Sequence, residues 1–442
     1  MLIVIICVLE FHYGQKKAMT KSKSIISKYF SNFSFQKLAF LLATLSVITI
    51  SFALGFHNAS LYNPNHGFDG SGHIYYIEYV NKNNKIPPPT EWETHQPPLY
   101  YIVSALILRI TDNIKSIQYI NIFVHWLIVC MVGLGLYKVL KDKTQVLLGM
   151  LSLVALPMLN IFPPMVSNEL LSTFFIISAI VAAIYLQYAT TKKQFIITTT
   201  WLTVSLVLAV WTKISVVTIL PTVIFALFLV RKVFSNKTVI TTIISVLVIF
   251  GLAYLPIFIR ADNSQSPSDI VGTVSAINKI PRPSGFYYRL DWIPKVDMYT
   301  TQYYSLLGGG WNSFWSDGHN VITPFVPFHK KAFILWTLGF ILLPISLYGL
   351  FRLLKTHRLS ALVIIITGIS MLTVFVLINA ACDHYSAVRL TYEMAIIIPY
   401  AFGIAAAAKN NRLVPVITLL LLIQFIIMVS FFWIQPWWFQ AT

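Results

Sequence analysis

The feature of this sequence that most constrains its fold is a series of long, nearly uncharged apolar blocks. Each block approaches the ~20 apolar residues that a helix needs to cross a bilayer. The blocks occupy residues 37–55, 118–137, 145–160, 170–188, 195–210, 214–230, 238–258, 332–350, 360–380, 390–408 and 413–433. Because backbone polar groups must be paired inside the bilayer, the blocks predict an all-α polytopic membrane protein with about eleven transmembrane helices.

The composition of the chain agrees with this class. Of the 442 residues, 57% are apolar and only 11% are charged, whereas soluble domains carry roughly 25% charged residues. The mean hydropathy is +0.73. A chain with so little charge cannot cover a globular surface, so the composition excludes a soluble globular protein, a disordered chain and a disulfide scaffold.

A further apolar block, at residues 98–111, is too short to cross comfortably and contains Arg109. If it does not cross, the basic residues of the short loops lie on the same side as the basic N-terminal tail. These residues are Lys138, Lys141, Lys143, Lys192, Lys193, Arg231, Lys232, Lys237, Arg352, Lys355, Arg358, Lys409 and Arg412. The positive-inside rule therefore predicts a cytoplasmic N-terminus and a re-entrant or juxtamembrane helix at 98–111.

This topology divides the chain into a basic cytoplasmic tail at 1–36 and a single membrane-embedded domain at 37–442. Met19 is an alternative first residue, since a short apolar stretch precedes the basic run of the tail. Two long polar loops, 56–97 and 259–331, face the exoplasm. The formal net charge of +17 then falls on the cytoplasmic side. Orientation accounts for the excess, so no nucleic-acid partner is predicted.

The first long loop is longer than a turn between two helices requires, and it is rich in acidic and imidazole groups. Such loops often carry a functional site; the alternative is a solvated cap on the helical bundle. Asp69 and His73 lie in the glycine-flanked stretch F-D-G-S-G-H, ahead of an expected helix at 73–83. In the alternative interpretation Asp69 only caps that helix. His95 and Gln96 close the loop in H-Q-P-P.

Three charged residues are expected at the outer ends of the apolar blocks. Glu169 opens a block after a Pro-Pro pair, where the helix dipole alone favours a carboxylate. Lys213 stands between two apolar blocks, where a cation is costly unless it pairs with an anion or snorkels to the interface. Arg389, close to Tyr392, precedes another block, and a plain ion pair with a carboxylate is its simplest role.

Other outer residues receive simpler interpretations. The aromatic residues of the second long loop, Trp292, Tyr303, Tyr304, Trp311 and Trp315, are typical of an interfacial belt. Asp317 and His319 are weak candidates for contact with an acceptor. Asn58 lies in an N-x-S sequon that this topology leaves accessible on the exoplasmic side.

The polar motifs resemble, as a set, the bacterial and archaeal glycosyltransferases of the dolichyl-phosphate-mannose-protein mannosyltransferase type. These belong to the GT-C superfamily (glycosyltransferase families 39 and 83). The resemblance runs from about residue 37 to residue 433. Its motifs are Asp69 with His73, K-I-P at 85–87, H-Q-P-P-L-Y-Y at 95–101, V-S-N-E at 166–169, W-T-K-I-S at 211–215 and V-R-L-T-Y at 388–392. One departure is Gly70, which stands where the family usually has a second acid.

The resemblance implies that a sugar passes from a polyprenyl-phosphate donor to a hydroxyl of a protein, lipid or glycan acceptor. The site would face the exoplasm, in a prokaryotic plasma membrane, and the reaction would invert the anomeric centre. Asp69 would be the general base, and Lys213 and Arg389 would bind the donor phosphate. The residues implied in substrate binding are His73, His95, Gln96, Glu169 and Tyr392.

Two alternatives remain open. One is a divalent metal held by Glu169, Glu93, His73 or His95, although no compact ligand spacing is present; no other cofactor is implied. The other is a multi-span transporter or flippase of a lipid-linked or small substrate. Only 19 of the 442 residues are Gly, and the polar groups gather in outer loops rather than at mid-span. Both features favour an enzyme.

Overall fold

The computed structural model describes residues 35–67, 69–91, 93–262, 284–290, 305–316, 329–381 and 389–435. Within these ranges the chain is helical apart from turns and connections, and it contains no β-strand. The predicted tail at 1–36 is therefore described only from residue 35. Five residues interpreted above lie outside the described ranges: Trp292, Tyr303, Tyr304, Asp317 and His319.

The helices are numbered along the chain, and η marks short 3-10 helices. They are α3 (Phe35–Leu61), α4 (Gly70–Asn83), α5 (Leu99–Thr111), α6 (Lys115–Leu140), α7 (Lys143–Val154), α8 (Pro157–Asn160), α9 (Glu169–Leu186), α10 (Lys192–Val210), η2 (Ile214–Ile219), α11 (Leu220–Leu229), η3 (Val230–Lys232), α12 (Asn236–Asp262), α15 (Leu306–Trp315), α16 (His329–Thr356), α17 (Arg358–Ala381), η7 (Leu390–Ile396), α18 (Ile397–Ala407) and α19 (Val414–Phe432).

Ten helical stretches in the described part of the chain are long and apolar enough to cross a membrane. Ten of the eleven predicted blocks correspond to these stretches, which confirms the all-α polytopic membrane fold. The eleventh block, 145–160, does not form a helix of that length. The predicted count of eleven is therefore not confirmed, and the difference lies in this one block.

A proline explains why block 145–160 is interrupted. Pro157 lacks a backbone N–H and restricts the residue before it, so Leu156 is extended (φ −80°, ψ 119°) and ends the helical run after the 12 residues of α7. The segment after α8 is nevertheless held against α6. The side-chain amides of Gln118 and Asn121 donate hydrogen bonds to the carbonyl groups of residues 164 and 165 (2.5 and 2.7 Å). Every residue from 152 to 170 is buried. Irregular backbone of this kind is tolerated in a membrane protein because protein covers it.

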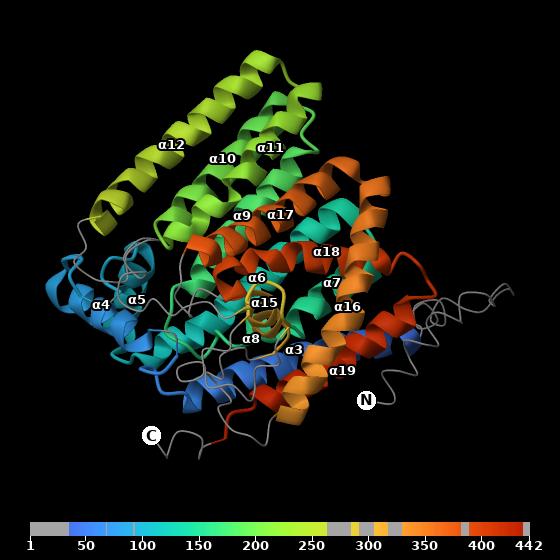
Figure 1. The fold of residues 1–442 in the computed structure, drawn as a ribbon, viewed down its shortest axis with the longest axis horizontal. Coiled ribbons are helices and arrows are strands. Elements are labelled where there is room, and N and C mark those ends of the chain that lie inside the picture. The colour runs from blue at the N-terminus through green and yellow to red at the C-terminus, as the bar shows by residue number, and fades with distance from the viewer. Residues whose placement is uncertain are drawn as a thin grey trace, which may run out of the picture.

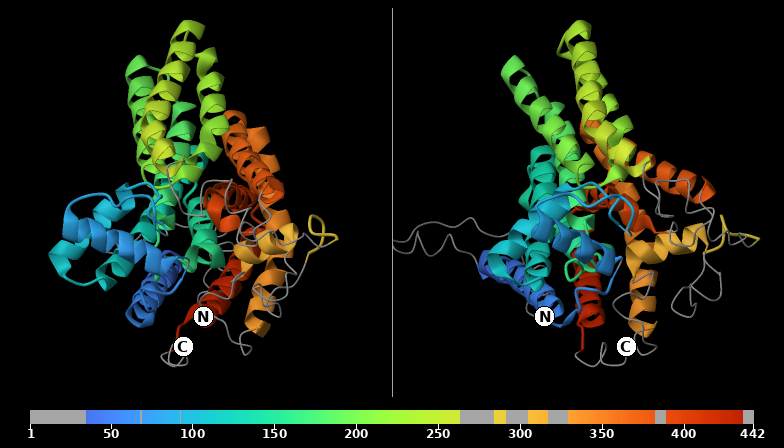
Figure 2. Two further views of the ribbon diagram at one scale, coloured as in Figure 1. Left: turned by 60° about the vertical axis from the view of Figure 1, so that its left-hand side comes forward. Right: turned by 90° about the vertical axis from the view of Figure 1, so that its left-hand side faces the viewer.

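The two ends of the bundle differ in charge. At one end lie α4 and α5 with the first residues of α6 and α9. The basic residues of the short loops lie at the opposite end, in the connections α6–α7, α9–α10, α11–α12, α16–α17 and α18–α19; we call this the basic end. Figure 1 shows α4 and α5 beside the C-terminal end of α12, far from the turn that joins α11 to α12. Figure 2 gives the same arrangement from two other sides.

The short helix α5 lies against α4 rather than crossing the bundle. Its 13 residues span about 20 Å. Tyr101 and Ala105 are buried, whereas Leu106 and Ile110 are exposed, with Ile110 at 85%. This pattern fits the predicted juxtamembrane helix, because one face packs on protein and the other can contact lipid.

The centre of the bundle is formed by α18, which packs closely on α16. In the span that contains α18, 94% of the residues are buried, against 17% for the span of α12. The crossing depends on Gly349 and Gly403: a Cβ atom on Gly349 would lie 1.7 Å from the Gly403 carbonyl oxygen. Ser346 fixes the same crossing by donating a hydrogen bond to the carbonyl of Tyr400 (3.0 Å). Only glycine permits this approach of two helix backbones.

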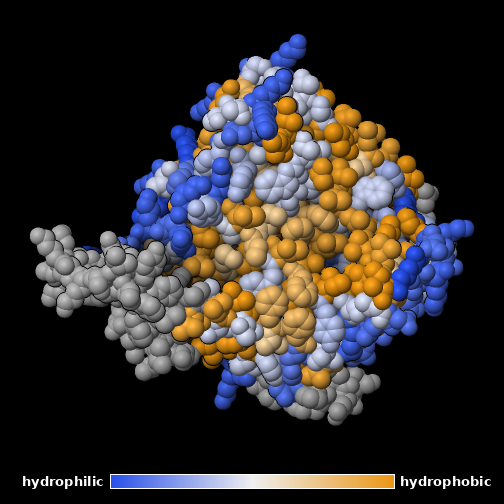
Figure 3. Space-filling view, turned by 180° about the vertical axis from the view of Figure 1, so that it is seen from behind, coloured by the Kyte–Doolittle hydropathy of each residue, from blue (hydrophilic) through white to orange (hydrophobic). Residues whose placement is uncertain are grey.

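The outer helices present apolar side chains to their surroundings. On α12, Ile244, Val248 and Leu252 are all more than half exposed. Figure 3 shows a broad apolar area across one face of the molecule, with hydrophilic residues gathered toward its edges. Such a large apolar surface requires a lipid environment, in agreement with the predicted bilayer.

Two of the simpler sequence interpretations are wrong. Asn58 is buried inside α3 and is 1% exposed, and its amide donates a hydrogen bond to the carbonyl of Phe432 (2.8 Å). The sequon is therefore not accessible, because α3 continues six residues beyond the predicted block. Trp315 is also buried, at 1% exposure, rather than interfacial.

Candidate active site

Stacked aromatic rings hold the first loop against α5. The rings of Tyr76 on α4 and Tyr101 on α5 stack with centroids 3.7 Å apart and planes 7° from parallel. The Tyr101 hydroxyl is 2.8 Å from Nδ1 of His73. The Leu99 amide donates a hydrogen bond to the carbonyl of Trp211 (2.8 Å), which joins the start of α5 to the turn that carries Lys213.

Asp69 lies immediately before α4, in the left-handed region of the backbone map (φ 55°). Its side chain is exposed and makes no capping hydrogen bond to α4. The interpretation of Asp69 as a simple helix cap is therefore wrong. The next residue, Gly70, is confined, since an added Cβ would lie 3.0 Å from the carbonyl oxygens of Pro64 and Asn65. A second acidic side chain at this position would be crowded against two carbonyl groups.

Behind Asp69, two buried titratable groups are held neutral. Burial, then the charges of Lys213 and His95, lowers the pKa of His73 to about 3. Burial, and then the nearby Asp69 carboxylate, raise the pKa of Glu93 to about 8, although the charge of Lys213 opposes the shift. Glu93 therefore carries a proton at neutral pH and can donate a hydrogen bond.

Gln96 and His95 are also buried or half-buried at this place. The amide nitrogen of Asn168 donates to Oε1 of Gln96 (3.4 Å) and to the carbonyl of Thr212 (3.2 Å). Gln96 in turn lies beside the Glu93 carboxyl, and His95 lies near His73. These contacts connect the end of the first loop to the starts of α9 and η2.

Lys213 and Glu169 form a buried ion pair. The Lys213 ammonium donates a hydrogen bond to Oε1 of Glu169, and the two side chains are 9% and 12% exposed. The ammonium also lies 4.9 Å from the centroid of the Tyr392 ring. This pair supplies the anion partner that a cation at Lys213 needs at this depth.

Arg389 and Glu393 bring two more charges to the same place. Arg389 is 8% exposed and lies one turn before Tyr392, whose hydroxyl is in electrostatic reach of Arg389, Asp69 and Glu169. Glu393, at 2% exposure, is in electrostatic reach of Lys213 and Glu169. Two cations, Lys213 and Arg389, and three carboxylates thus lie around Tyr392 in η7, just before α18.

Arg260, the last basic residue of α12, ties the first loop to the bundle. Its Nη2 atom donates hydrogen bonds to the carbonyl groups of Pro87 and Thr94, both at 2.5 Å. Its guanidinium also lies 6.0 Å from the centroid of the Tyr76 ring. Arg260 therefore fixes the backbone that carries Glu93, His95 and Gln96.

The described residues do not form a metal-binding group. Nowhere in the described ranges do three or more His, Cys, Asp or Glu side chains lie close enough to hold a metal ion. The acidic and imidazole groups also have other partners: His73 contacts Tyr101, and Glu169 pairs with Lys213. The arrangement of the described residues does not fit the metal site that the sequence leaves open.

The structure brings the site residues proposed from the sequence into one cluster. This cluster, the candidate site, contains Asp69, His73, His95, Gln96, Glu169, Lys213, Arg389 and Tyr392, together with Glu93 and Glu393. The sequence suggests Glu93 only as a metal ligand, and it does not point to Glu393 through any motif. A signal for Glu393 was present, since it is a carboxylate inside an apolar block.

No protein-family model matches the sequence, and no curated protein matches it. Solved structures match the fold. ArnT from Cupriavidus metallidurans in the apo state has a TM-score of 0.52 at 12% identity, covering 85% of this chain and 60% of that one. ArnT bound to undecaprenyl phosphate has a TM-score of 0.52 at 11% identity, covering 83% and 60%. The Archaeoglobus fulgidus oligosaccharyltransferase complex with Zn and sulfate has a TM-score of 0.51 at 14% identity, covering 87% and 53%.

These neighbours define the class of the fold. ArnT and the archaeal oligosaccharyltransferase are both membrane glycosyltransferases of the GT-C superfamily. This chain therefore has the GT-C fold, which confirms the fold expected from the resemblance. It spans about three fifths of the length of ArnT and about half that of the oligosaccharyltransferase.

Proposed function

We propose that this protein is a membrane glycosyltransferase that moves a sugar from a polyprenyl-phosphate donor to an acceptor hydroxyl. The observation that carries the proposal is the candidate site itself. It combines an exposed carboxylate, Asp69, with two buried cations, Lys213 and Arg389, at one end of a GT-C fold. ArnT, which shares the fold, has been solved with undecaprenyl phosphate, and this supports a polyprenyl-phosphate donor.

In the proposed reaction Asp69 takes the proton of the acceptor hydroxyl. The hydroxyl oxygen attacks the anomeric carbon as the bond from that carbon to the phosphate oxygen breaks. The lipid phosphate leaves with the electron pair of that bond, and the charges of Lys213 and Arg389 stabilise it. A single displacement of this kind inverts the anomeric centre. The acceptor is a protein, lipid or glycan hydroxyl.

The remaining residues of the candidate site position these three groups. Glu169 holds the Lys213 ammonium in place through the buried ion pair, and the Tyr392 ring packs against that ammonium. Because Glu93 is protonated at neutral pH, it can donate a hydrogen bond to a sugar oxygen or to Asp69. His73, His95 and Gln96 shape the wall on which the sugar would rest.

The distribution of basic residues supports an exoplasmic site. The basic loops lie at the end of the bundle opposite the candidate site, and basic loops favour the cytoplasm. We therefore place the N-terminus in the cytoplasm and the candidate site outside, in the plasma membrane of a prokaryote. A transporter or flippase would place its polar groups near mid-span, whereas Glu169, Lys213 and Arg389 stand at the beginnings of α9, η2 and η7.

The test is transfer from a radiolabelled polyprenyl-phospho-sugar in purified membranes, using wild type, Asp69→Asn and Glu78→Gln. Because general-base catalysis contributes about 10²–10⁴-fold, Asp69→Asn lowers transfer by that factor and keeps donor binding. Glu78→Gln is the matched control: Glu78 is exposed on α4, the helix that follows Asp69, and its ion pair among the described residues is with Lys82 on the surface (3.6 Å). Turnover like that of the wild type in Asp69→Asn would refute the assignment of the base.

A further inference from the structure

A cavity of about 560 Å³ lies at the basic end, well away from the candidate site. Its walls come from α3, α6, α7, α16 and α19, and the turns that close it are α6–α7, α16–α17 and α18–α19. Lys409, on its rim, is separated from Tyr392 by the whole of α18, whose 11 residues span about 16 Å. The proposed transfer reaction therefore makes no use of this cavity.

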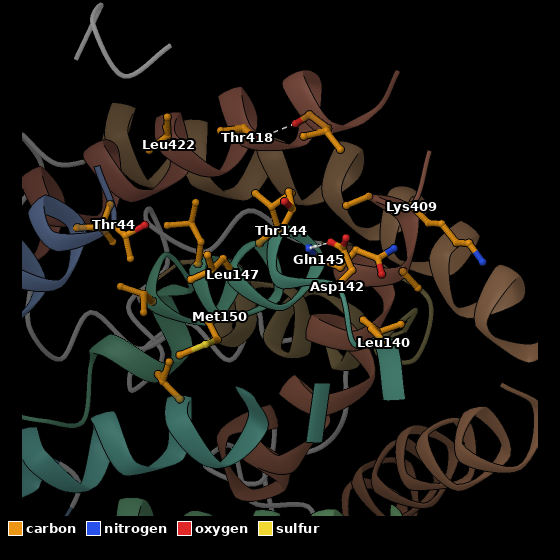
Figure 4. A pocket seen from close by; sticks show the side chains of 18 of the residues that line it. Thr44, Leu140, Asp142, Thr144, Gln145, Leu147, Met150, Lys409, Thr418 and Leu422 are labelled. Atoms are coloured by element: carbon orange, nitrogen blue, oxygen red, sulfur yellow. Dashed lines mark hydrogen bonds between the residues drawn. The ribbon is translucent and has the colours of Figure 1, made fainter. Parts of the chain in front are cut away.

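The cavity is polar at one side and apolar at the other. Figure 4 shows Asp142 and Gln145 at one side, with Lys409 beyond them and its side chain extending outward, and Leu147, Met150 and Leu422 at the other side. Threonine side chains, among them Thr44, Thr144 and Thr418, lie among the apolar ones. A ligand that fits this lining has a charged or polar head and an apolar chain.

The rim of the cavity carries an excess of positive charge. Arg352 and Lys409 both line it, and no described carboxylate lies within 4.0 Å of either cation. The one acidic group of the rim, Asp142, caps α7 by accepting a hydrogen bond from the Gln145 amide (2.8 Å). The pKa of His357, between α16 and α17, is lowered by partial burial and then by the charge of Lys409. An anion placed here would relieve the repulsion among these groups.

The surroundings of the cavity give access to the bilayer. α3 and α19, which form part of its wall, also expose Leu42 (54%), Leu45 (48%) and Leu419 (42%) to the lipid-facing surface. Arg352, near the end of α16, and Lys409, just after α18, both stand at the ends of membrane-spanning helices, the depth at which phospholipid headgroups lie. Basic pockets between helix ends are known to bind anionic headgroups.

We propose that this cavity is a binding site for an anionic phospholipid of the leaflet at the basic end. The phosphate lies between Arg352 and Lys409, and one acyl chain runs along Leu147, Met150 and Leu422. The site neither contacts the sugar donor nor requires the proposed function. A bound lipid would hold together α3, α7, α16 and α19, which meet at the cavity.

Native mass spectrometry of the full-length protein in detergent tests the proposal, with phosphatidylglycerol and phosphatidylcholine as probes. The double variant Arg352→Gln/Lys409→Gln removes the two rim cations. Each basic residue near an anionic headgroup strengthens binding about fivefold, so this variant binds phosphatidylglycerol about 25-fold more weakly. The matched control is Lys355→Gln/Arg412→Gln, which removes the same charge from the same two turns without touching the cavity lining. It weakens binding less than about twofold.

Three results would overturn the proposal. Equal weakening in both double variants would show that general surface charge binds the lipid. Equal affinity for phosphatidylglycerol and phosphatidylcholine would show that the headgroup charge is not recognised. Tighter binding of undecaprenyl phosphate than of phosphatidylglycerol, lost in the rim variant, would make the cavity a polyprenyl-phosphate site.

A second variant tests the apolar part and guards against misfolding of the first. Thr418→Phe fills the cavity from α19, where Thr418 is 8% exposed, and leaves both rim cations in place. It lowers phosphatidylglycerol binding at least tenfold, while inorganic phosphate added at equal concentration does not compete. Unchanged lipid binding in a monodisperse Thr418→Phe protein would refute insertion of the chain. Because these experiments measure lipid binding and not sugar transfer, a negative result would refute the lipid site without bearing on the proposed transfer reaction.

Discussion

The buried ion pair between Lys213 and Glu169 provides the sharpest test of how the candidate site is held together. The two side chains are only 9% and 12% exposed, so solvent and salt screen their attraction little. Replacing Lys213 by Met leaves the Glu169 carboxylate buried without its partner, which costs about 3–5 kcal/mol. In a chain of this length 1 kcal/mol corresponds to roughly 1–2 °C in Tm. Lys213→Met is therefore expected to lower Tm by about 3–10 °C.

The double variant Lys213→Met/Glu169→Gln separates the contribution of the ion pair to stability from the role of Lys213 in transfer. Replacing both members of a buried pair is often neutral or stabilising, so the double variant regains a Tm within about 2 °C of wild type. Transfer stays lost, because the proposed phosphate cation is gone. Tm is measured by intrinsic fluorescence in one detergent at one lipid content. If the double variant is destabilised by the sum of the two single changes, the pair contributes nothing and the reasoning is refuted.

Three further changes test the packing, the buried acid and the first loop. Gly403→Ala forces α16 and α18 apart and lowers Tm by several degrees, at a cost of about 3 kcal/mol, whereas Gly251→Ala, with open space around its Cβ position, does not. Burial raises the pKa of Glu93 to about 8 from an ordinary 4.5, so the fold loses stability as pH rises between these values. Glu93→Gln is expected to remove that loss; a Tm–pH profile as steep as wild type would contradict it. Arg260→Gln removes two hydrogen bonds to first-loop carbonyl groups and speeds deuterium exchange there; unchanged protection would refute its role.

Part of the candidate site was predictable from the sequence, for a simple reason. In a chain with so few charges, a polar residue near an apolar block stands out, and Lys213, Glu169 and Arg389 were all found in this way. Asp69 and His73 were found because their loop is longer than a turn requires. Glu393 does not stand out in this way, because it directly follows the V-R-L-T-Y motif at the start of an apolar block.

The pairing of these groups could not be read from the sequence. Glu169 and Lys213 are 44 residues apart, and nothing local distinguishes a carboxylate that caps a helix from one that neutralises a cation. The neutral state of Glu93 likewise depends on its burial and on Asp69 beside it. Both are properties of contacts between distant segments.

The sequence by itself determined the number of apolar blocks to within one, their helical character and the segregation of basic residues to one end. These follow from hydropathy and from the need to pair every backbone group in a membrane, which act along the chain. Only the tertiary structure decided the rest: Pro157 and the buried segment after it break one crossing, Gly349 and Gly403 let two helices touch, and a lipid-sized cavity remains at the basic end. The physical reason is that close packing and burial depend on which helix surfaces contact one another in the tertiary structure. One pattern of apolar blocks along the sequence is compatible with many such sets of contacts.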